Sequence, residues 1–335
     1  MQTDGFLSII EEDAPLKQAL EWDRSGMQVA SSSNWIKTVA LTLDPLPANI
    51  SSALQKGCDF IISHHPLAIK PRLPDKPDSF HKILSHLFQA DAALYSAHTS
   101  LDVNPRGPVS WMARELELED TRIIMPTGRT MCQRLYFEPP LHISREQISR
   151  LAKVEHIQEE NGLVSRILIQ SHILDRFLED LEAETGPLQF RKRYHPGDDI
   201  LYGLGLIGTC RQEVSFSNFV DKLQKCLGMD RFICTGRQPA LIRKIAYCPG
   251  SGGDLAARAF AMGADIFITG DIKYHQALDI QESGFAMDVG HFILEEKMMQ
   301  VWCSILRQKV SGLDFHYIQG KTPLNISDVQ ALKSV

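Results

Sequence analysis

The chain has 335 residues, 44% of them hydrophobic and 23% charged, with a formal net charge of −6 at pH 7. At ~150 residues per domain this length favours about two domains, and the apolar content excludes an intrinsically disordered chain. The acidic balance, without a long run of Lys or Arg, argues against specific binding to nucleic acids or membrane surfaces. No apolar run approaches the ~20 residues that cross a bilayer, and the first residues lack a signal-peptide pattern, so we expect a cytoplasmic protein.

Strands and helices alternate along the first third of the sequence. Apolar periodicity predicts helices over 6–10 and 16–20, a strand over 37–44, a helix that ends at Gly57, a strand over 58–63, a helix over 79–89, a strand over 92–97 and a helical stripe over 109–116. The last third repeats the pattern, with strands over 244–248, 265–269 and 285–289 and helices over 254–262, 274–281 and 291–309. This alternation is typical of an α/β layer with a largely parallel sheet.

The middle of the chain is richer in charged residues than the two flanking parts. Its predicted elements are a strand over 131–137, a helix over 145–151, strands over 155–160 and 163–170 around the hairpin signal Asn161-Gly162, a helix over 173–184 and a strand over 188–194. The order βαββαβ is the ferredoxin-like pattern. We therefore expect two halves of one core, 1–129 and 201–335, separated by an inserted domain over 130–200. Arg191-Lys192-Arg193 in its last strand is either a solvated face or a contact for a polyanion.

Three segments concentrate side chains that can bind metals. They contain His64 and His65, then His98 and Asp102, and finally His291 and Glu295, and each segment follows an apolar strand. In open α/β sheets, binding sites form at the carboxyl ends of the strands. If the strands are parallel, all three segments meet at the same edge of a sheet.

The spacing within these segments favours two metal ions. His291 and Glu295 are four residues apart and share one helix face, whereas the side chains of the adjacent His64 and His65 diverge. Two ions can use both of these histidines, with Asp102 or Glu295 as a bridge. Imidazole and carboxylate ligands suit zinc, iron(II), manganese or cobalt better than calcium or magnesium.

Each feature also has an ordinary explanation. A His-His pair can be a loop feature, His-x-x-x-Glu a surface pair, His98 a satisfied core residue and Asp102 a helix cap. Their coincidence at three strand ends favours the metal site. Two weaker candidates remain: His275 as a proton donor, and a turn that either offers backbone N–H groups to an anion or packs a strand against a helix, namely Gly250, Ser251, Gly252 and Gly253.

Several segments together resemble one known family. They are CDFIISHHPLAIKP (58–71), SAHTSLDVNPRG (96–107), AYCPGSGG (246–253), ADIFITGDIKYH (264–275) and MDVGHFILEE (287–296). The chain resembles the NIF-three-like family, also named GTP cyclohydrolase 1 type 2 homologues. EWDRSGMQVA (21–30) is similar to a family segment too, except that Arg24 replaces the usual Asn and Ala30 the usual Gly.

The resemblance implies a three-layer αβα sandwich built from both chain halves, with a centre of two divalent metal ions. The implied ligands are His64, His65, Asp102, His291 and Glu295, and His98 matches a position close to the metals. The resemblance further implies a cytoplasmic toroidal hexamer, a trimer of dimers, in which some members carry an inserted domain similar to PII-type signalling proteins.

The leading functional hypothesis is a metal-dependent hydrolase. The family label implies that hydroxide formed at the metals opens the guanine ring of GTP at C8. His98 and His275 are the candidates for the acid that protonates nitrogen, and the 250–253 turn is the candidate site for phosphate. A phosphoesterase using the same two metals is the nearest enzymatic alternative. A metal-binding regulator or carrier without turnover, and a scaffold with structural metals, are alternatives of other classes.

Overall fold

The computed structural model describes residues 1–324 and divides the chain into two compact units. The larger unit comprises Met1–Thr127 together with the chain from Gly203 onward, and the smaller unit is Gly128–Tyr202. Residues 325–335, the last eleven of the predicted second core half (201–335), lie outside the described residues. Among residues 1–324, no helix combines the length and apolar character needed to cross a bilayer.

The first sheet of the larger unit has the strand order β1-β4-β3-β2-β15. Its strands are β1 (Gly26–Val29), β2 (Thr38–Thr42), β3 (Phe60–Ser63), β4 (Ala93–Ser96) and β15 (Asp314–Tyr317). β15, β2, β3 and β4 are parallel, and only β1 is antiparallel to its neighbour. One face is covered by α2 (Pro47–Gln55) and α3 (Ser79–Ala90), whose apolar residues form a buried cluster with the strands.

The second sheet of the larger unit has the order β11-β14-β13-β12-β10-β5. Its strands are β5 (Glu119–Thr130), β10 (Ile200–Ser215), β11 (Ile233–Gly236), β12 (Leu241–Ser251), β13 (Ile266–Gly270) and β14 (Phe285–Asp288). β12, β13 and β14 are parallel, whereas β10 and β11 run antiparallel to them. Its outer face packs on α9 (Ala256–Ala261) and α10 (Tyr274–Ser283).

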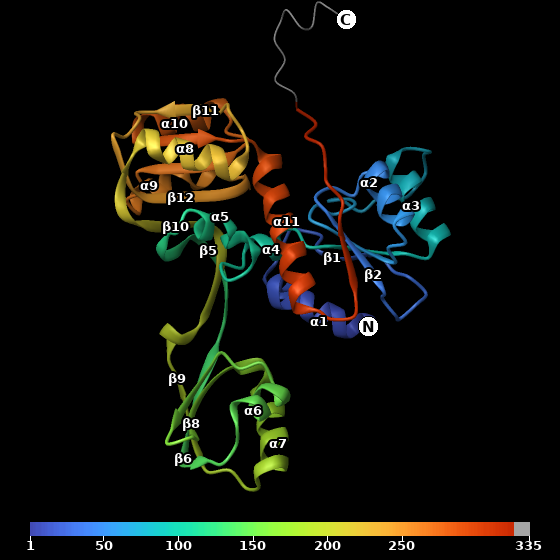
Figure 1. The fold of residues 1–335 in the computed structure, drawn as a ribbon, viewed down its shortest axis with the longest axis vertical. Coiled ribbons are helices and arrows are strands. Elements are labelled where there is room, and N and C mark those ends of the chain that lie inside the picture. The colour runs from blue at the N-terminus through green and yellow to red at the C-terminus, as the bar shows by residue number, and fades with distance from the viewer. Residues whose placement is uncertain (325–335) are drawn as a thin grey trace, which may run out of the picture. The chain divides into compact units, whose positions relative to one another are not determined.

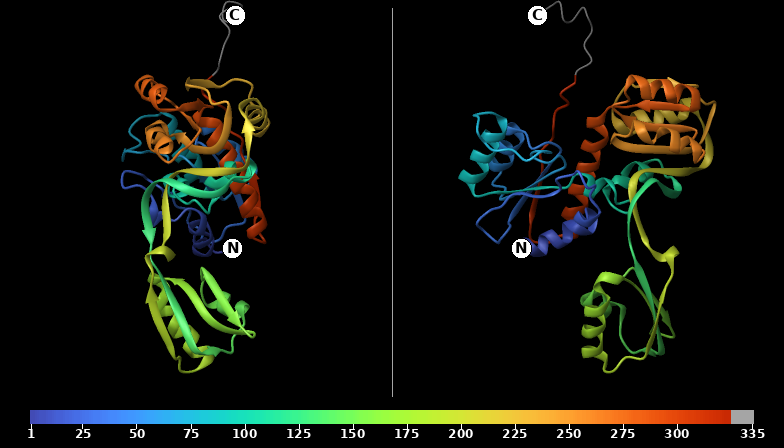
Figure 2. Two further views of the ribbon diagram at one scale, coloured as in Figure 1. Left: turned by 90° about the vertical axis from the view of Figure 1, so that its left-hand side faces the viewer. Right: turned by 180° about the vertical axis from the view of Figure 1, so that it is seen from behind.

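The inner faces of both sheets share one core of buried apolar side chains. Helices that contribute to it are α1 (Thr3–Asp13), α5 (Trp111–Glu115), α8 (Phe216–Leu227) and α11 (His291–Lys309). The long helix α11 lies between the two sheets in Figure 1 and in the right-hand view of Figure 2. Each sheet is therefore the middle of an α/β/α sandwich, and a central helical layer belongs to both.

This arrangement corrects one expectation. The three ligand segments do not meet at the edge of a single sheet, because β3 and β4 belong to the first sheet and β14 to the second. The first half of the chain builds one sheet around β2–β4, and the second half builds the other around β12–β14. What the halves share is α11 and the core around it.

The smaller unit contains four antiparallel strands in the order β7-β8-β6-β9. Its elements are β6 (Cys132–Leu141), α6 (Arg145–Leu151), β7 (His156–Glu160), β8 (Leu163–Gln170), α7 (Leu174–Thr185) and β9 (Phe190–Tyr194). Asn161 and Gly162 join β7 and β8 and both have positive φ, at 53° and 78°, as the turn of a tight hairpin requires. The helices and one face of the sheet bury a separate apolar cluster.

The remaining short helices complete the described chain. They are α4 (Thr99–Asp102) and 3₁₀ turns at Leu16–Gln18, Pro108–Ser110, Ser171–Ile173, Pro196–Asp198 and Gly253–Leu255. Although α4 is only one turn long, it follows β4 directly and positions two of the candidate site residues.

Candidate metal centre

The predicted ligands lie together at the carboxyl ends of parallel strands from both sheets. His64 and His65 follow β3, and Asp102 ends the short helix after β4. His291 and Glu295 occupy the first turns of α11, which follows β14. Because α11 lies between the sheets, its first turns bring residues of the second chain half to those of the first.

Glu295 is at the centre of this cluster and is only 4% exposed. Its Oε1 is 3.5 Å from Nε2 of His64, while its Oε2 is 3.2 Å from Nε2 of His65 and 2.9 Å from Nε2 of His291. Oδ1 of Asp102 lies 3.7 Å from the same Nε2 of His64. The two oxygens of Glu295 thus face different imidazoles.

Every imidazole of the cluster is held from outside through its Nδ1. His64 bonds to the carbonyl oxygen of Ala97 at 2.8 Å. The other three bond to aspartates, each at 2.7 Å: His65 to Asp44, His98 to Asp23 and His291 to Asp271. Carbonyl and carboxylate oxygens accept from Nδ1–H, which leaves the lone pair on Nε2. In the neutral form of each ring, Nε2 is therefore the nitrogen available to bind a metal ion.

Four inward-facing atoms of the cluster are buried and have no hydrogen-bond partner. They are Nε2 of His64, Oδ1 of Asp102, Nε2 of His291 and Oε2 of Glu295. Leaving buried polar atoms unpaired costs ~1–3 kcal/mol each. Nitrogen and carboxylate donors in this state fit divalent cations such as zinc, iron or manganese.

The ionisable groups of the cluster shift one another's pKa values. Burial alone would raise the pKa of Glu295, but the imidazoles of His64, His291 and His65 hold it well below its usual range. For His65, burial would lower the pKa, yet its contacts with Asp44 and Glu295 raise it to about 10. Burial raises the pKa of Asp102, against the attraction of His64. Metal binding must therefore displace protons from the imidazoles.

Two overlapping triplets have ligand atoms close enough to share an ion. His65, His291 and Glu295 form one triplet, and His64, His65 and His98 form the other. In each, the three ligand atoms lie within 4.8 Å of one another. His98 was expected only to lie near the metals. Its ring is close enough to His64 and His65 for it to act as a ligand itself.

The predicted 250–253 turn is the end of β12, which runs to Ser251, followed by the start of a 3₁₀ turn at Gly253, and its Gly250 packs tightly against the cluster. Gly250 has a φ of +66°, and a Cβ there would lie 2.3 Å from Oε1 of Glu295. A Cβ on Gly252 would meet Cys248 and Thr269, and the N–H of Gly252 donates to Oγ1 of Thr269. These glycines leave room for the Glu295 carboxylate and for close packing. Anion binding at Gly250, Ser251, Gly252 and Gly253 stays a prediction.

We expect Gly250→Ala to weaken metal binding by ~10–100-fold, the range seen when groups that orient ligands are removed. The new methyl group would displace Glu295, and the left-handed backbone adds ~1–2 kcal/mol of strain. Gly263→Ala is the matched control, because Gly263 has a φ of +87° and a Cβ there meets only the flexible Lys244 side chain. Zinc titration against a chromophoric chelator measures the difference. Equal affinities in the two variants would contradict the role given to Gly250.

His275 is the one predicted catalytic residue that no described contact joins to the cluster. It lies exposed near the start of α10, with its ring 5.5 Å from that of Tyr274. Conversely, the sequence analysis missed the outer aspartates Asp23, Asp44 and Asp271. Asp44 and Asp271 follow β2 and β13 as the ligands follow their strands, a signal that could have identified them. Asp23 lies in the 21–30 segment, which only the resemblance had singled out.

The fold and the cluster together define an α/β protein with a buried set of imidazoles and carboxylates suited to divalent cations. Its sequence matches the family described as Duf34/NIF3 (NGG1p interacting factor 3) over residues 1–323, and the chain belongs to that family.

Relatives with similar sequences cover almost the whole chain. A protein of Listeria innocua named GTP cyclohydrolase 1 type 2 homolog is 29% identical, over 88% of this chain and 89% of its own length. A Staphylococcus aureus protein of the same name is 26% identical, over 87% and 89%. Among solved structures, the Bacillus cereus protein related to NIF3 has a TM-score of 0.81 at 23% identity and covers 98% of this chain and 99% of its own. That structural similarity supports the fold.

Proposed function

We propose that the chain is a hydrolase that uses two divalent metal ions, with GTP as the first substrate to test. The observation that carries the proposal is a cluster of buried donor atoms on His64, Asp102, His291 and Glu295, each within 3.7 Å of another member of the cluster. The choice of GTP comes from the name of the relatives, GTP cyclohydrolase 1 type 2 homolog.

The geometry around Glu295 supports two ions rather than one. We assign Oε1 of Glu295, His64 and Asp102 to one position, and Oε2 of Glu295, His65 and His291 to the other. Within each set the polar atoms lie close together, at distances of 2.9–3.7 Å, so that one ion could contact all of them. Glu295 would then bridge the ions.

Divalent cations held there would supply a Lewis acid that polarises the substrate and lowers the pKa of water. The residues of the chain position the ligands, balance charge and move a proton. Asp44 and Asp271 hold the His65 and His291 rings in place, and Glu295 and Asp102 offset part of the cationic charge. His98 is the candidate for moving a proton from the attacking water to the ring nitrogen released when C8 of guanine is hydrolysed. His275, which is further along the chain and exposed, is the weaker candidate.

The test loads the full chain separately with zinc, manganese, iron(II) and cobalt and measures metal per chain. GTP is then assayed for a ring-opened product one water heavier, and p-nitrophenyl phosphate for phosphate release. We expect two ions per chain and ring opening that is lost in His65→Gln. Phosphate release alone would replace the proposal with a phosphoesterase, and full loading without turnover would replace it with a metal carrier or regulator. Absence of bound metal would overturn all three.

Two further expectations from the resemblance stay predictions. They are assembly into a toroidal hexamer of this chain and a cytoplasmic location. Light scattering of the purified protein measures the first, and fractionation of the source cells the second.

A further inference from the structure

The aspartate that holds His98 differs from those that hold the other imidazoles. The Asp23 side chain is 0% exposed, whereas those of Asp44 and Asp271 are 29% and 47% exposed. Asp23 comes from the segment before β1, far along the chain from the partner it binds. A buried carboxylate is costly unless its oxygens are well bonded, so its surroundings need an explanation.

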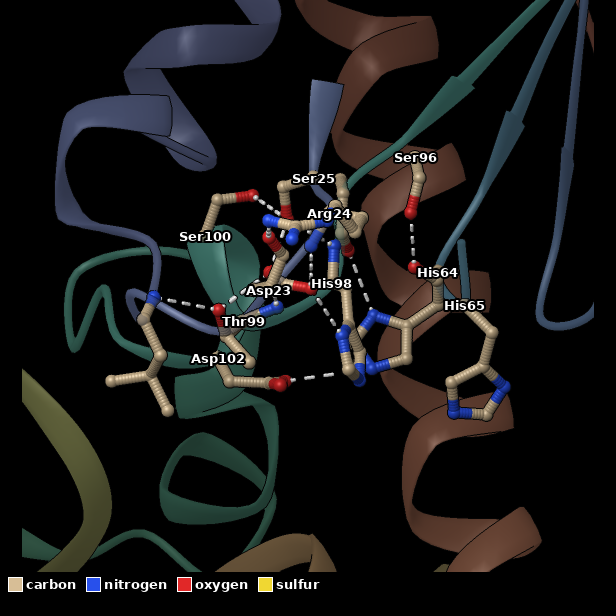
Figure 3. Close-up of polar contacts among 12 residues, drawn as sticks. Asp23, Arg24, Ser25, His64, His65, Ser96, His98, Thr99, Ser100 and Asp102 are labelled. Carbon is tan, nitrogen blue, oxygen red and sulfur yellow. Dashed lines mark hydrogen bonds and ion pairs between the residues drawn. The ribbon is translucent and has the colours of Figure 1, made fainter. Parts of the chain in front are cut away.

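Five hydrogen bonds fix both oxygens of Asp23. Oδ1 accepts from Nδ1–H of His98 at 2.7 Å and from the backbone N–H of Arg24 at 2.6 Å. Oδ2 accepts from the hydroxyls of Ser25 and Thr99, both at 2.6 Å, and from the backbone N–H of Thr99 at 3.0 Å. The Arg24 guanidinium bonds instead to the backbone carbonyl oxygen of Asp23. His98 is thus the ionisable side chain to which this carboxylate is bonded (Figure 3).

The His98 ring is held equally firmly and is aimed at the cluster. Its backbone N–H donates to Oγ of Ser25, and its ring lies edge-on to His64 at 5.2 Å and to His65 at 5.5 Å. Trp22 covers another side of the ring at 5.7 Å. Unlike His64, His65 and His291, His98 makes no described ion pair with Glu295 or Asp102.

We propose that Asp23 is a positioning residue that holds His98 in the Nδ1–H tautomer, with Nε2 presented to the substrate side of the metal centre. The inference rests on the proposed function, since it gives His98 the task of carrying a proton. If Asp23 only anchored the surrounding loop, its bonds to Thr99, Ser25 and Arg24 would be enough. It would not need the bond to the imidazole.

The test has a readout that does not depend on turnover. Long-range ¹H–¹⁵N spectra of the zinc-loaded full chain report which imidazole nitrogen carries hydrogen, and His98→Gln assigns the signal. We expect Nδ1–H in the unsubstituted protein and a shifted or mixed tautomer in Asp23→Asn. Asp59→Asn is the matched control, because Asp59 also accepts backbone N–H groups, from Lys37 and Thr38, but does not contact an imidazole. It should leave the His98 signal unchanged.

Kinetics separates positioning from simple anchoring. We expect Asp23→Asn to lower kcat for GTP by ~10–100-fold, as for other groups that orient a functional imidazole, with KM and zinc content little changed. If Asp23 acts through His98, Asp23→Asn should have almost no further effect in a His98→Gln background.

Three results would overturn the proposal: an Nε2–H tautomer in the unsubstituted protein, an unchanged tautomer in folded Asp23→Asn, or additive losses in the double variant. If Asp23→Asn does not fold, the tautomer of the unsubstituted protein still decides. If the chain binds no zinc or leaves GTP intact, the proposed function fails, and the tautomer, read from the chain as purified, tests the positioning role on its own.

Discussion

Replacing Glu295 with Gln is expected to reduce zinc affinity by more than the ~100-fold upper range for groups that only orient ligands, because Glu295 faces three imidazoles directly. Gln has the same shape but lacks the negative charge that both proposed ion positions share. Its amide nitrogen also cannot act as a ligand in place of the second oxygen. Isothermal titration with zinc, together with metal content after gel filtration, measures the loss.

The next residue along α11 provides the control. Glu296 is similarly buried, at 2% exposed, but its Oε1 accepts from the backbone N–H of Gly320 at 2.9 Å instead of facing the cluster. Glu296→Gln keeps an oxygen for that bond and should bind zinc as the unsubstituted protein does. Equal zinc affinity in Glu295→Gln and Glu296→Gln would remove Glu295 from the proposed ligands.

Trp302→Ala is expected to destabilise the larger unit by ~3–5 kcal/mol, the usual cost of truncating a large buried aromatic side chain. Trp302 is 0% exposed in the core between the two sheets, and its indole N–H donates to Asp13 in α1 at 2.9 Å. The substitution leaves a cavity and removes the hydrogen bond that the indole donates to the Asp13 carboxylate. Because Trp302 and Glu295 share α11, weakened packing there should also loosen the metal centre.

Tryptophan fluorescence follows this unfolding selectively, because the four tryptophans, 22, 35, 111 and 302, all lie in the larger unit. Urea titrations of the variant report its free energy of unfolding through the three that remain. Trp35→Ala is the control: Trp35 is 60% exposed and should cost less than ~1 kcal/mol. A loss in Trp302→Ala no larger than in Trp35→Ala would show that α11 does not join the sheets as described.

Elements with strong local signals could be predicted from the sequence. The helix expected over 291–309 is α11 at the same bounds, and the hairpin expected at Asn161-Gly162 joins β7 and β8. In both cases, the periodicity or turn chemistry lies within a few neighbouring residues. The α/β class followed from the alternation of such elements.

Elements that depend on distant partners were missed. No strand was predicted for β5, β10, β11 or β15, and no helix for α8. β15 pairs with β2 from the other end of the chain, and β5 and β10 complete the second sheet beside β12. Such strands are stabilised by neighbours more than by their own propensity. The existence of two sheets depends on these pairings. The expectation that all three ligand segments meet at the edge of one sheet was therefore wrong.

By itself, the sequence determined which residues are candidates for the metal centre, because each lies beside a buried strand in a compact motif. Only the tertiary structure decided how they meet, with Glu295 between imidazoles from the other half of the chain. It also revealed the outer carboxylates. Asp23 and His98 are 75 residues apart, and no local pattern joins them, since a hydrogen bond between side chains depends on position in space.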